Sequence, residues 1–185
     1  VTLPKKLEVT KSMQIGIIGK NGVGKTTLIK SILWEEALLE WSVKITPNLI
    51  IGSYGQIVES MNGTNSIMDE LLWPWASMKE ILGILWSLSV SAEKAQQKIA
   101  TLSWGEKAKV ALTKMLLTKP DVIIMDEPTN HLDILSKESI TMMLQQFSWV
   151  SIIISHDRDF LSQVSNIIRV IQDKKLHVYE DVEKG

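Results

Sequence analysis

Cysteine is absent from the 185-residue chain, so disulfides and thiolate metal sites are excluded. The same absence fits a reducing compartment, and we expect a cytoplasmic protein. The chain also lacks the run of about 20 apolar residues that a membrane-spanning helix needs, because its best candidate, residues 81–90, is interrupted by Gly83, Ser87 and Ser89. Its formal net charge of -1 creates no general basic field for nucleic acid. An ordinary globular domain is the class that remains.

Short apolar runs that are typical of buried strands alternate with segments of helical periodicity. We expect strands over residues 14–18, 49–54, 122–125 and 151–154, and a final hairpin over residues 167–171 and 176–179. We expect helices over residues 25–33, 67–72, 78–88, 93–100, 107–118 and 136–147. This alternation predicts an α/β fold with a largely parallel core sheet.

A glycine-rich stretch joins the first predicted strand to the first predicted helix. Residues 19–26 read Gly-Lys-Asn-Gly-Val-Gly-Lys-Thr and match the P-loop pattern G-x-x-x-x-G-K-[ST] without a mismatch. Glycines let backbone N–H groups turn towards phosphates, and the helix N-terminus adds a positive end. Lys25 would bridge the β- and γ-phosphates of ATP and Thr26 would hold Mg²⁺, although a glycine-rich turn that matches by chance is the alternative. The candidate ATP-binding residues are Gly19, Lys20, Asn21, Gly22, Val23, Gly24, Lys25, Thr26 and Thr27.

Two acidic residues, Asp126 and Glu127, follow the apolar run 122–125. Buried acids at a strand end are unfavourable unless a cation or hydrogen bonds compensate them. Asp126 is suited to hold Mg²⁺ through water, and Glu127 is suited to polarise the attacking water as a general base. An exposed acidic turn is the alternative interpretation.

His156 and Gln56 follow two other predicted strands, 151–154 and 49–54. Doubly wound folds place their sites beyond the carboxyl ends of such strands. His156 could therefore reach the γ-phosphate, and Gln56 could contact Mg²⁺ or the attacking water. A structural histidine and a surface glutamine are the alternatives.

Four features, taken together and in this order, resemble the ABC ATPases: the P-loop, Gln56, Leu-Ser-Trp-Gly-Glu at residues 102–106 and Asp-Glu-Pro-Thr at residues 126–129. The third is similar to that family's signature, which usually reads Leu-Ser-Gly-Gly-Gln or Leu-Ser-Gly-Gly-Glu. Two longer strings resemble the ABC-F proteins more narrowly. They are Asp-Glu-Pro-Thr-Asn-His-Leu-Asp at residues 126–133 and Ser-His-Asp-Arg-Asp-Phe-Leu at residues 155–161.

This resemblance implies an ABC-type nucleotide-binding domain of the P-loop NTPase class over residues 1–185, with a helical subdomain at about residues 60–118. ABC-F proteins carry two such domains in one chain, and each of two ATPs is held by one P-loop and the other domain's signature. ATP closes the pair and hydrolysis opens it. Many members bind the ribosome and act in translation, and some protect it from antibiotics. In this chain the residues that would contact ATP in trans are Ser103, Trp104, Gly105 and Glu106.

The chain also departs from the family pattern. The family has two strands and an adenine-stacking aromatic residue before the P-loop, whereas the 18 residues before Gly19 include no aromatic one. The resemblance therefore implies a truncated N-terminus and leaves the adenine contact unassigned. Only 103 − 56 = 47 positions separate Gln56 from Ser103. That spacing is short for the helical arm of a first ABC-F domain, and it favours a second domain or a member without the arm.

The chain has seven tryptophans but only two phenylalanines and two tyrosines. Core or interface packing would explain them. However, Trp104 replaces a signature glycine, and Trp34, Trp41 and Trp149 stand at turns where the family often has glycine. Certain bacteria read the UGA codon as glycine and others read it as tryptophan. Translation with the wrong codon table would therefore put tryptophan at glycine positions, and our hypothesis is that some or all of these residues are glycines in the living protein. The family gives no firm expectation for the remaining three, Trp73, Trp75 and Trp86.

Three functions remain open from the sequence. The first is an ABC-F ATPase that acts on translation. The second is the ATPase subunit of a membrane transporter, against which the two ABC-F strings argue. The third is an ATP-dependent clamp that binds ATP and hydrolyses it slowly, which Trp104 favours and intact Glu127 and His156 oppose.

Overall fold

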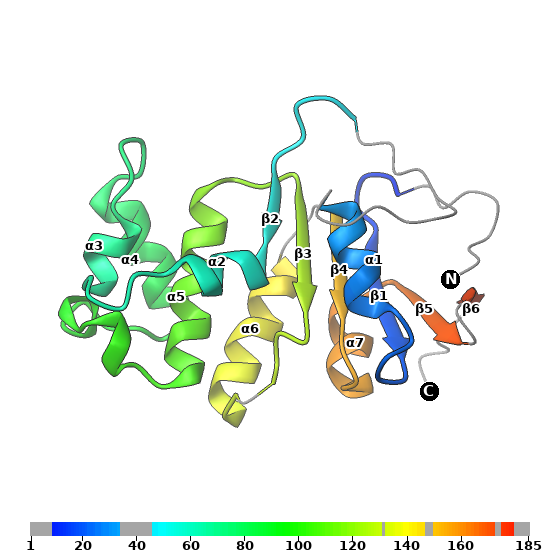
Figure 1. Ribbon diagram of the computed structural model, residues 1–185. Helices are drawn as coiled ribbons and strands as arrows, with labels where there is room; N and C mark the ends of the chain where they lie inside the picture. The colour runs from blue at the N-terminus through cyan, green and yellow to red at the C-terminus, as the bar shows by residue number, and fades with distance from the viewer. Residues whose placement is uncertain (1–8, 34–45, 131, 147–149, 173–174, 180–185) are drawn as a thin grey trace. The chain divides into compact units, whose positions relative to one another are not determined.

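The computed structural model describes residues 9–33, 46–130, 132–146, 150–172 and 175–179 (Figure 1). The chain forms two compact units. Residues 1–51, 121–128 and 148–185 make the first unit, and residues 52–120 and 129–147 make the second. Each unit is described by itself below. Within the described residues, no helix combines the length and the apolar character required to cross a membrane.

A six-stranded sheet carries the P-loop, and its strand order is β2-β3-β4-β1-β5-β6 (Figure 1). β1 pairs in parallel with β4 and β5, and β3 pairs in parallel with β4. β5 and β6 form an antiparallel pair, so both the parallel core and the final hairpin are confirmed. The strands are β1 (Gln14–Gly19), β2 (Ile51–Ser53), β3 (Val122–Asp126), β4 (Val150–Ile154), β5 (Ile167–Gln172) and β6 (Lys175–Tyr179).

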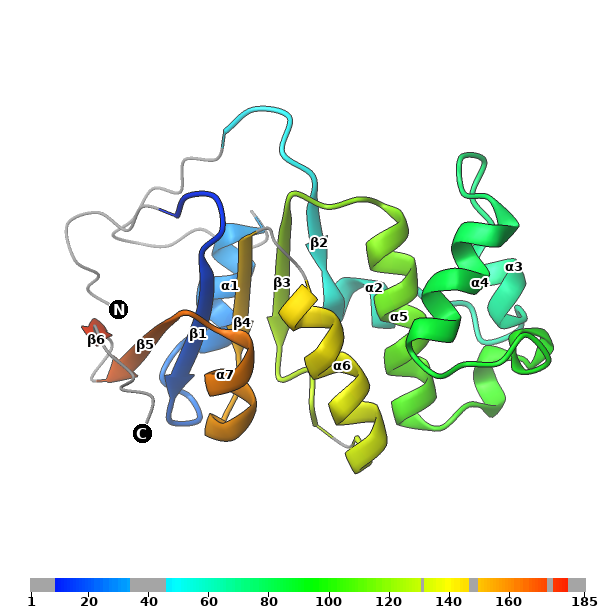
Figure 2. The same ribbon diagram turned by 180° about the vertical axis from the view of Figure 1, so that it is seen from behind.

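Two helices cover the two faces of strand β1 in the first unit, as Figures 1 and 2 show from opposite sides. They are α1 (Lys25–Ile32) and α7 (Arg158–Val164). Ile17 of β1 is buried in one apolar cluster with Leu28 of α1. On the opposite face a Cβ at Gly16 would lie only 3.2 Å from Leu161 Cδ2 of α7. Alternation of side chains along a strand explains this two-sided burial, because neighbouring residues point to opposite faces.

The second unit is helical. Its core surrounds the longest helix, where Val110 and Leu117 are buried together with Leu71 and Leu85 from two other helices. Burial of such apolar side chains is the main favourable term in folding. The helices are α2 (Tyr54–Ser60), α3 (Ile67–Leu71), α4 (Met78–Ser87), α5 (Trp104–Leu117) and α6 (Ile134–Gln146), with 3-10 turns η1 (Lys94–Gln96) and η2 (Ile99–Thr101).

The helix predicted over residues 93–100 is wrong. The structure has the two 3-10 turns there, separated by the extended Gln97 and Lys98. The backbone of this segment is hydrogen-bonded elsewhere: Ile67 N donates to Gln97 O, and Ile99 N donates to Asn65 O. A chain whose backbone groups pair with a distant segment cannot also make a continuous helical ladder.

Sequence patterns also missed or misplaced three helix starts. Helices α2 and α7 were not predicted, because each has only seven residues and shows too little periodicity. Helix α5 starts at Trp104 rather than at residue 107, because Ser103 and Glu106 form a capping box before it. The predicted end of the 136–147 helix lies outside the described residues.

Candidate functional site

The P-loop connects β1 to α1, and two of its glycines have backbones that other residues rarely adopt. Gly22 has φ 74° and Gly24 has φ 104°, both in the left-handed region. Gly19 is needed for a different reason, since a Cβ there would lie 2.9 Å from the carbonyl oxygen of Ile171. These glycines therefore let the loop fold tightly in front of the N-terminus of α1, where backbone N–H groups favour an anion.

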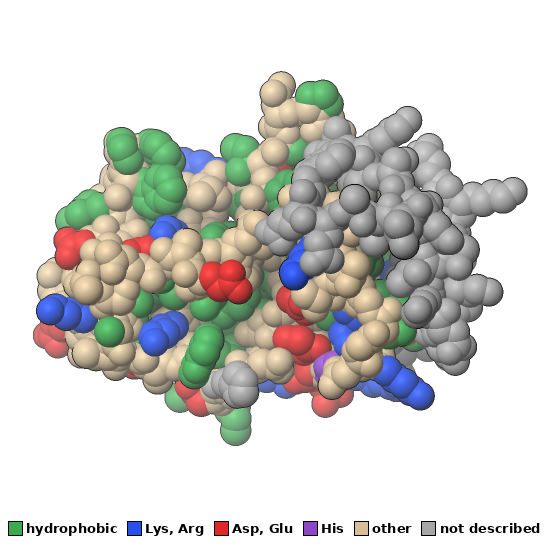
Figure 3. Space-filling model, viewed as in Figure 1, with side chains coloured by type: hydrophobic (Ala, Val, Ile, Leu, Met, Phe, Trp, Pro, Cys, Tyr) green, Lys and Arg blue, Asp and Glu red, His purple; other side chains and the backbone are tan. Residues whose placement is uncertain are grey.

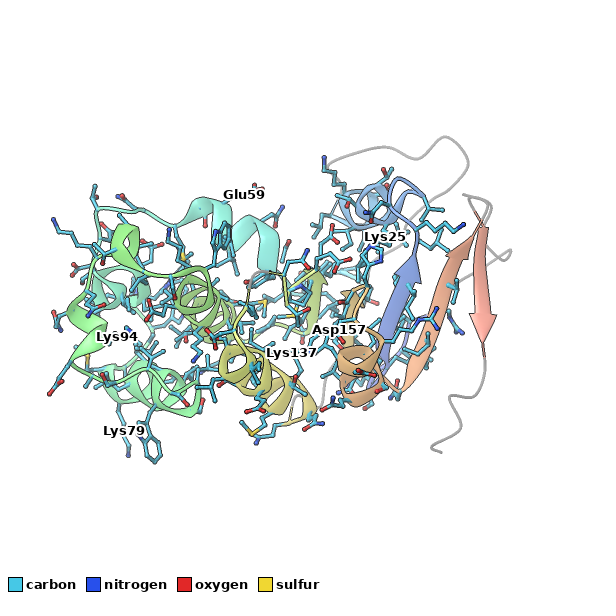
Figure 4. All side chains as sticks on the ribbon, turned by 90° about the horizontal axis from the view of Figure 1, so that it is seen from below. Lys25, Glu59, Lys79, Lys94, Lys137 and Asp157 are labelled. Carbon is cyan, nitrogen blue, oxygen red and sulfur yellow. The ribbon has the colours of Figure 1, made fainter. Side chains whose placement is uncertain are left out.

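Lys25, the first residue of α1, folds its side chain back over the P-loop (Figure 4). Its Nζ donates to Gly19 O at 2.7 Å and to Lys20 O at 3.2 Å, and it lies 3.1 Å from His156 Nε2. The residue is only 8% exposed. A buried ammonium held by carbonyl oxygens is a strong donor for a phosphate that enters the loop.

Thr26 and Asp126 meet across the first unit. Thr26 Oγ1 donates to Asp126 Oδ2 at 2.8 Å, although the two residues are 100 positions apart in sequence. Asp126 is the last residue of β3, and Thr26 belongs to the first turn of α1. A hydroxyl and a carboxylate are oxygen donors of the kind that Mg²⁺ takes from a protein.

Glu127 follows Asp126 with a left-handed backbone of φ 48°, which is unusual for a residue with a side chain. Its N–H donates to Ile154 O of β4 at 2.9 Å, so the backbone is anchored to the neighbouring strand. Oε2 accepts from His156 N at 3.3 Å and from Ser155 Oγ at 3.4 Å. Oε1 is shielded from solvent and, among the described residues, accepts no hydrogen bond.

His156 brings the site together through its Nε2 atom. This atom lies 2.7 Å from Asn21 Oδ1, 3.1 Å from Lys25 Nζ and 3.3 Å from Glu127 Oε1. In one tautomer Nε2 donates to the Asn21 amide oxygen, and in the other it accepts from the Lys25 ammonium. The imidazole can therefore offer either a proton or a lone pair beside the P-loop.

This donor set fits Mg-ATP. Glycine backbone turns and Lys25 suit phosphates, and Thr26 with Asp126 suits a hard cation. Within the described residues, no three His, Cys, Asp or Glu side chains gather closely enough to hold a metal by themselves. Protein sites for Mg²⁺ typically use one or two carboxylates together with substrate phosphates, so this sparse set is the expected one. The shielded Oε1 of Glu127, which accepts no hydrogen bond from the described residues, suits a water molecule.

The signature, residues 102–106, begins helix α5 in the second unit. Ser103 is the N-cap: its Oγ accepts from Glu106 N at 3.3 Å, and its own N–H donates to Glu106 Oε2 at 2.8 Å. Glu106 also accepts from Lys94 Nζ. The hydrogen bond from Lys94, followed by that from the Ser103 backbone, lowers the pKa of Glu106. The Glu106 carboxylate is therefore engaged within its own unit.

Trp104 is the first residue of α5 and its side chain is 57% exposed. Trp104 is not among the residues with positive φ, so its backbone carries no left-handed strain. The tryptophan has ordinary helical backbone, so only its indole distinguishes it from glycine here. Trp75 and Trp86 are also exposed, at 62% and 81%. Four residues named in the sequence analysis lie outside the described residues: Trp34, Trp41, Trp149 and His131, the last from the ABC-F-like string at residues 126–133.

Gly105 packs against the start of α6. A Cβ on Gly105 would lie 2.7 Å from Ser136 Oγ and 3.0 Å from Asp133 Oδ2. Asp133 accepts from Ser136 N at 2.8 Å and from Ser136 Oγ at 2.9 Å, and these bonds lower its pKa, the backbone bond most. The signature thus lies directly against the residues that start α6.

In the first unit the structure brings the predicted residues Asp126, Glu127 and His156 to the P-loop, which includes Lys25 and Thr26. Gln56 lies on α2 in the second unit, on a helix rather than in a loop after a strand, and its predicted contact with Mg²⁺ or water stays a prediction. Sequence reasoning missed Ser155, Asp133, Ser136 and Lys94. The Ser-x-x-Glu spacing of Ser103 and Glu106 could have indicated the capping box, but no local pattern indicates Lys94 as its partner.

Comparison with known proteins agrees with this geometry. Residues 4–130 match the family described as "ABC transporter". The "uncharacterized ABC transporter ATP-binding protein YfmM" of Bacillus subtilis is 34% identical over 165 residues, covering 88% of this chain and 32% of that protein. The "ABC transporter F family member 5" of Arabidopsis thaliana is 32% identical over 178 residues, covering 94% of this chain and 26% of that protein. The chain spans less than a third of the length of these relatives.

Solved structures show the same fold. The dimeric structure of MJ0796, a bacterial ABC transporter cassette, superposes with a TM-score of 0.81 at 20% identity, covering 97% of this chain and 89% of that one. A post-hydrolysis state of MJ0796 bound to ADP and Pi gives a TM-score of 0.79 at 20% identity and covers the same shares. The predicted fold class is therefore confirmed.

Proposed function

The chain belongs to the ABC transporter family of ATP-binding cassettes, and from that membership we propose that it is the ATP-hydrolysing cassette of an ABC-F-type protein. The observation that carries the proposal is the convergence of Lys25, Thr26, Asp126, Glu127 and His156 on one loop. These side chains come from α1 and from the ends of β3 and β4. Their chemistry suits phosphate, a divalent cation and a water molecule.

Each residue has a role in this proposal. Lys25 binds the β- and γ-phosphates from within the P-loop, and Thr26 and Asp126 hold Mg²⁺. When bound, Mg²⁺ neutralises charge on the phosphate oxygens. Glu127 accepts a proton from the attacking water at its shielded Oε1, which accepts no hydrogen bond from the described residues. His156 donates through Nε2 towards the γ-phosphate that replaces its contact with Lys25 or Asn21.

The partner in this proposal is a second ABC domain, in the same chain or in a second copy. Residues 103–106 form a capped helix start whose backbone N–H groups suit the phosphate of an ATP held elsewhere. MJ0796, which shares the fold, is described as dimeric. Closure of two domains on ATP would complete each site, and hydrolysis would release them.

The two long strings support the narrower ABC-F assignment. Residues 155–161 enclose the start of α7, where Asp157 Oδ1 accepts from Phe160 N at 2.9 Å, and His156 lies one residue before that cap. A relative that carries the ABC-F name shares 32% identity over 94% of this chain. On this assignment the protein acts on the ribosome in the cytoplasm as a translation or ribosome-protection factor.

A transporter ATPase is the second candidate, because both the family description and MJ0796 refer to ABC transporters. It would use the same site residues, so the chemistry cannot separate the two functions. The partner can: an ABC-F protein binds ribosomes, whereas a transporter ATPase binds a membrane subunit.

Replacement of Glu127 by glutamine tests the proposal in the full-length protein. The change keeps size and one carbonyl oxygen but removes the base, so turnover should fall by about 10²–10⁴-fold while ATP still binds. The trapped protein should then sediment with ribosomes in ATP. Glu138→Gln, at an exposed position on α6, is the matched control and should hydrolyse ATP like the wild type.

Three results would count against parts of this proposal. Unchanged turnover in Glu127→Gln would remove Glu127 as the base. Sedimentation with membranes in place of ribosomes would favour the transporter ATPase. A wild-type protein that binds ATP without turnover would support the slow clamp.

A further inference from the structure

Each oxygen of the Glu106 carboxylate has a hydrogen-bond donor within its own unit. One oxygen accepts from the N–H of Ser103, and the other accepts from the ammonium of Lys94. The side chains of Glu106 and Lys94 are 28% and 36% exposed, so the pair sits at the edge of the unit. Both oxygens of Glu106 are therefore already engaged by donors of its own unit.

Lys94 comes from a segment that is itself well anchored. Its neighbour Ala95 is completely buried, and Ile99 is 2% exposed in the same apolar cluster. Lys94 N also donates to Ser91 Oγ at 3.3 Å. Figure 4 labels Lys94 on this segment, in the second unit. The ammonium is thus presented to Glu106 from a fixed backbone rather than from a loose chain.

The geometry of the cap depends on where the Glu106 carboxylate points. A glutamate at the third helical position can turn back to the N-cap N–H or extend into water. A lysine beside the first arrangement favours it over the second, because it attracts the ionised group. Freed from Lys94, the glutamate would leave the Ser103 N–H for part of the time, and the start of α5 would loosen.

We propose that Lys94 is a positioning residue for the signature: it holds Glu106 on the Ser103 N–H and so fixes the direction in which the start of α5 faces a partner domain. This inference rests on the proposed function, since it assumes that residues 103–106 complete an ATP site in trans. It assigns Glu106 to the cap, in contrast to the nucleotide contact expected from the family resemblance. The Ser103 hydroxyl, which accepts from Glu106 N, still has its own proton to donate towards a phosphate.

The test compares Lys94→Met with Lys98→Met in the full-length protein. Methionine keeps the apolar stem of lysine without its charge, and Lys98 is exposed on the same segment. Lys94→Met should lower kcat/KM for ATP by about two- to fivefold, the range that partly exposed ion pairs contribute. The dissociation constant of Mg-ATP at the P-loop should not change. Lys94→Arg should restore wild-type turnover, and Lys98→Met should retain it.

A double-mutant cycle shows whether Lys94 acts through Glu106. Glu106→Gln keeps an oxygen for the Ser103 N–H but removes the charge that attracts Lys94. In that background Lys94→Met should have no further effect on turnover. An equal loss in both backgrounds, or no loss in the wild-type background, would overturn the inference.

A titration separates this inference from the proposed function. The pKa of Glu106 lies below its ordinary value of 4.5, with Lys94 as the largest cause. Carbon-detected NMR of Glu106 should show that pKa rising in Lys94→Met and staying unchanged in Lys98→Met. If the Glu106 pKa is the same in the wild type and in Lys94→Met, the inference is overturned even when the protein is an active ATPase. If instead the pKa rises in Lys94→Met but the wild type hydrolyses no ATP, the Lys94–Glu106 interaction is established and the proposed ATPase function is contradicted.

Discussion

The P-loop site of the first unit and the signature of the second unit are built in different ways. Around the P-loop, side chains are brought together by the ends of parallel strands, whose backbone ladders fix their spacing. The signature depends on one helix start, held by Ser103, Glu106 and the charged partner Lys94. The first arrangement stays fixed unless the sheet opens, whereas the second can change when a single side chain moves.

This difference has a consequence for how the two sites respond to solution conditions. Sheet hydrogen bonds carry no net charge, so salt should affect the P-loop geometry little. The Lys94–Glu106 pair is partly exposed and is screened by salt. The signature is therefore the adjustable half of the proposed ATP cycle, and the P-loop is the constant half.

Among these substitutions, Lys25→Ala should have the largest effect, a loss of ATP affinity at the P-loop. It removes a buried ammonium whose charge-assisted hydrogen bonds contribute about 1.5–3 kcal/mol each. ATP affinity should therefore fall about tenfold or more, as measured by calorimetry with Mg-ATP. Lys79→Ala, at an exposed position on α4, is the control. Equal affinities of wild type and Lys25→Ala would contradict the assignment of the P-loop.

Gly105→Ala should have the next largest effect, a lower free energy of unfolding caused by poorer packing of the signature against α6. The new Cβ would meet Ser136 Oγ at 2.7 Å and disturb the Asp133–Ser136 cap. Overpacking costs about 1–3 kcal/mol, which exceeds the gain of up to about 1 kcal/mol that alanine brings to a helix.

Gly83→Ala is the matched control for that change, because Gly83 lies in α4 and a Cβ added there would meet nothing within 4 Å beyond its chain neighbours and its own helix backbone. It should raise the free energy of unfolding by about 0.5–1 kcal/mol. Denaturant melts of the two variants should therefore shift in opposite directions. Stabilisation by both substitutions would contradict the prediction, because it would mean that Ser136 moves aside for the new Cβ at little cost.

Trp104→Gly tests the exposed surface of the signature rather than its packing. Removal of the exposed indole would let a partner domain approach the start of α5, and we expect ATP turnover to rise about tenfold, or about 1.4 kcal/mol. Binding at the protein's own P-loop should not change. An unchanged rate would mean that the partner accommodates the indole, and a UGG codon at position 104 would make the tryptophan genuine.

The sequence alone predicted most of the P-loop half. Gly19 to Thr26 form a contiguous motif, and Asp126, Glu127 and His156 each follow an apolar strand whose end marks the site. Parallel strands end at the same edge of the sheet, so the prediction of a parallel core was enough to expect these residues near one another, although the strand order came only from the structure.

The signature half was less predictable, because its geometry depends on contacts between distant segments. The pairing of residues 97 and 99 with residues 65 and 67 replaced a predicted helix by short turns. Lys94 and Glu106 are 12 positions apart, and no periodic pattern links them. The glycine at residue 105 faces α6, a contact that a local motif cannot indicate.

The exposed tryptophans bear on the hypothesis that some are glycines. Of the four described ones, three are exposed, and none belongs to the buried core, which includes Phe160 and Tyr54. Figure 3 shows hydrophobic side chains raised from the surface in the second unit. A tryptophan normally contributes to stability by burial, so the three exposed ones add little to the fold, and the glycine hypothesis for Trp104 stays a prediction.

The left-handed backbone of Glu127 has a consequence for anyone who redesigns this cassette. A residue with a side chain in that conformation costs about 1–2 kcal/mol, and only glycine or asparagine occupies it easily. Replacement of Glu127 by glycine or asparagine should therefore stabilise the fold. On the proposed role of Glu127 as the general base, the same replacement would abolish turnover, so stability and turnover make opposite demands on this residue.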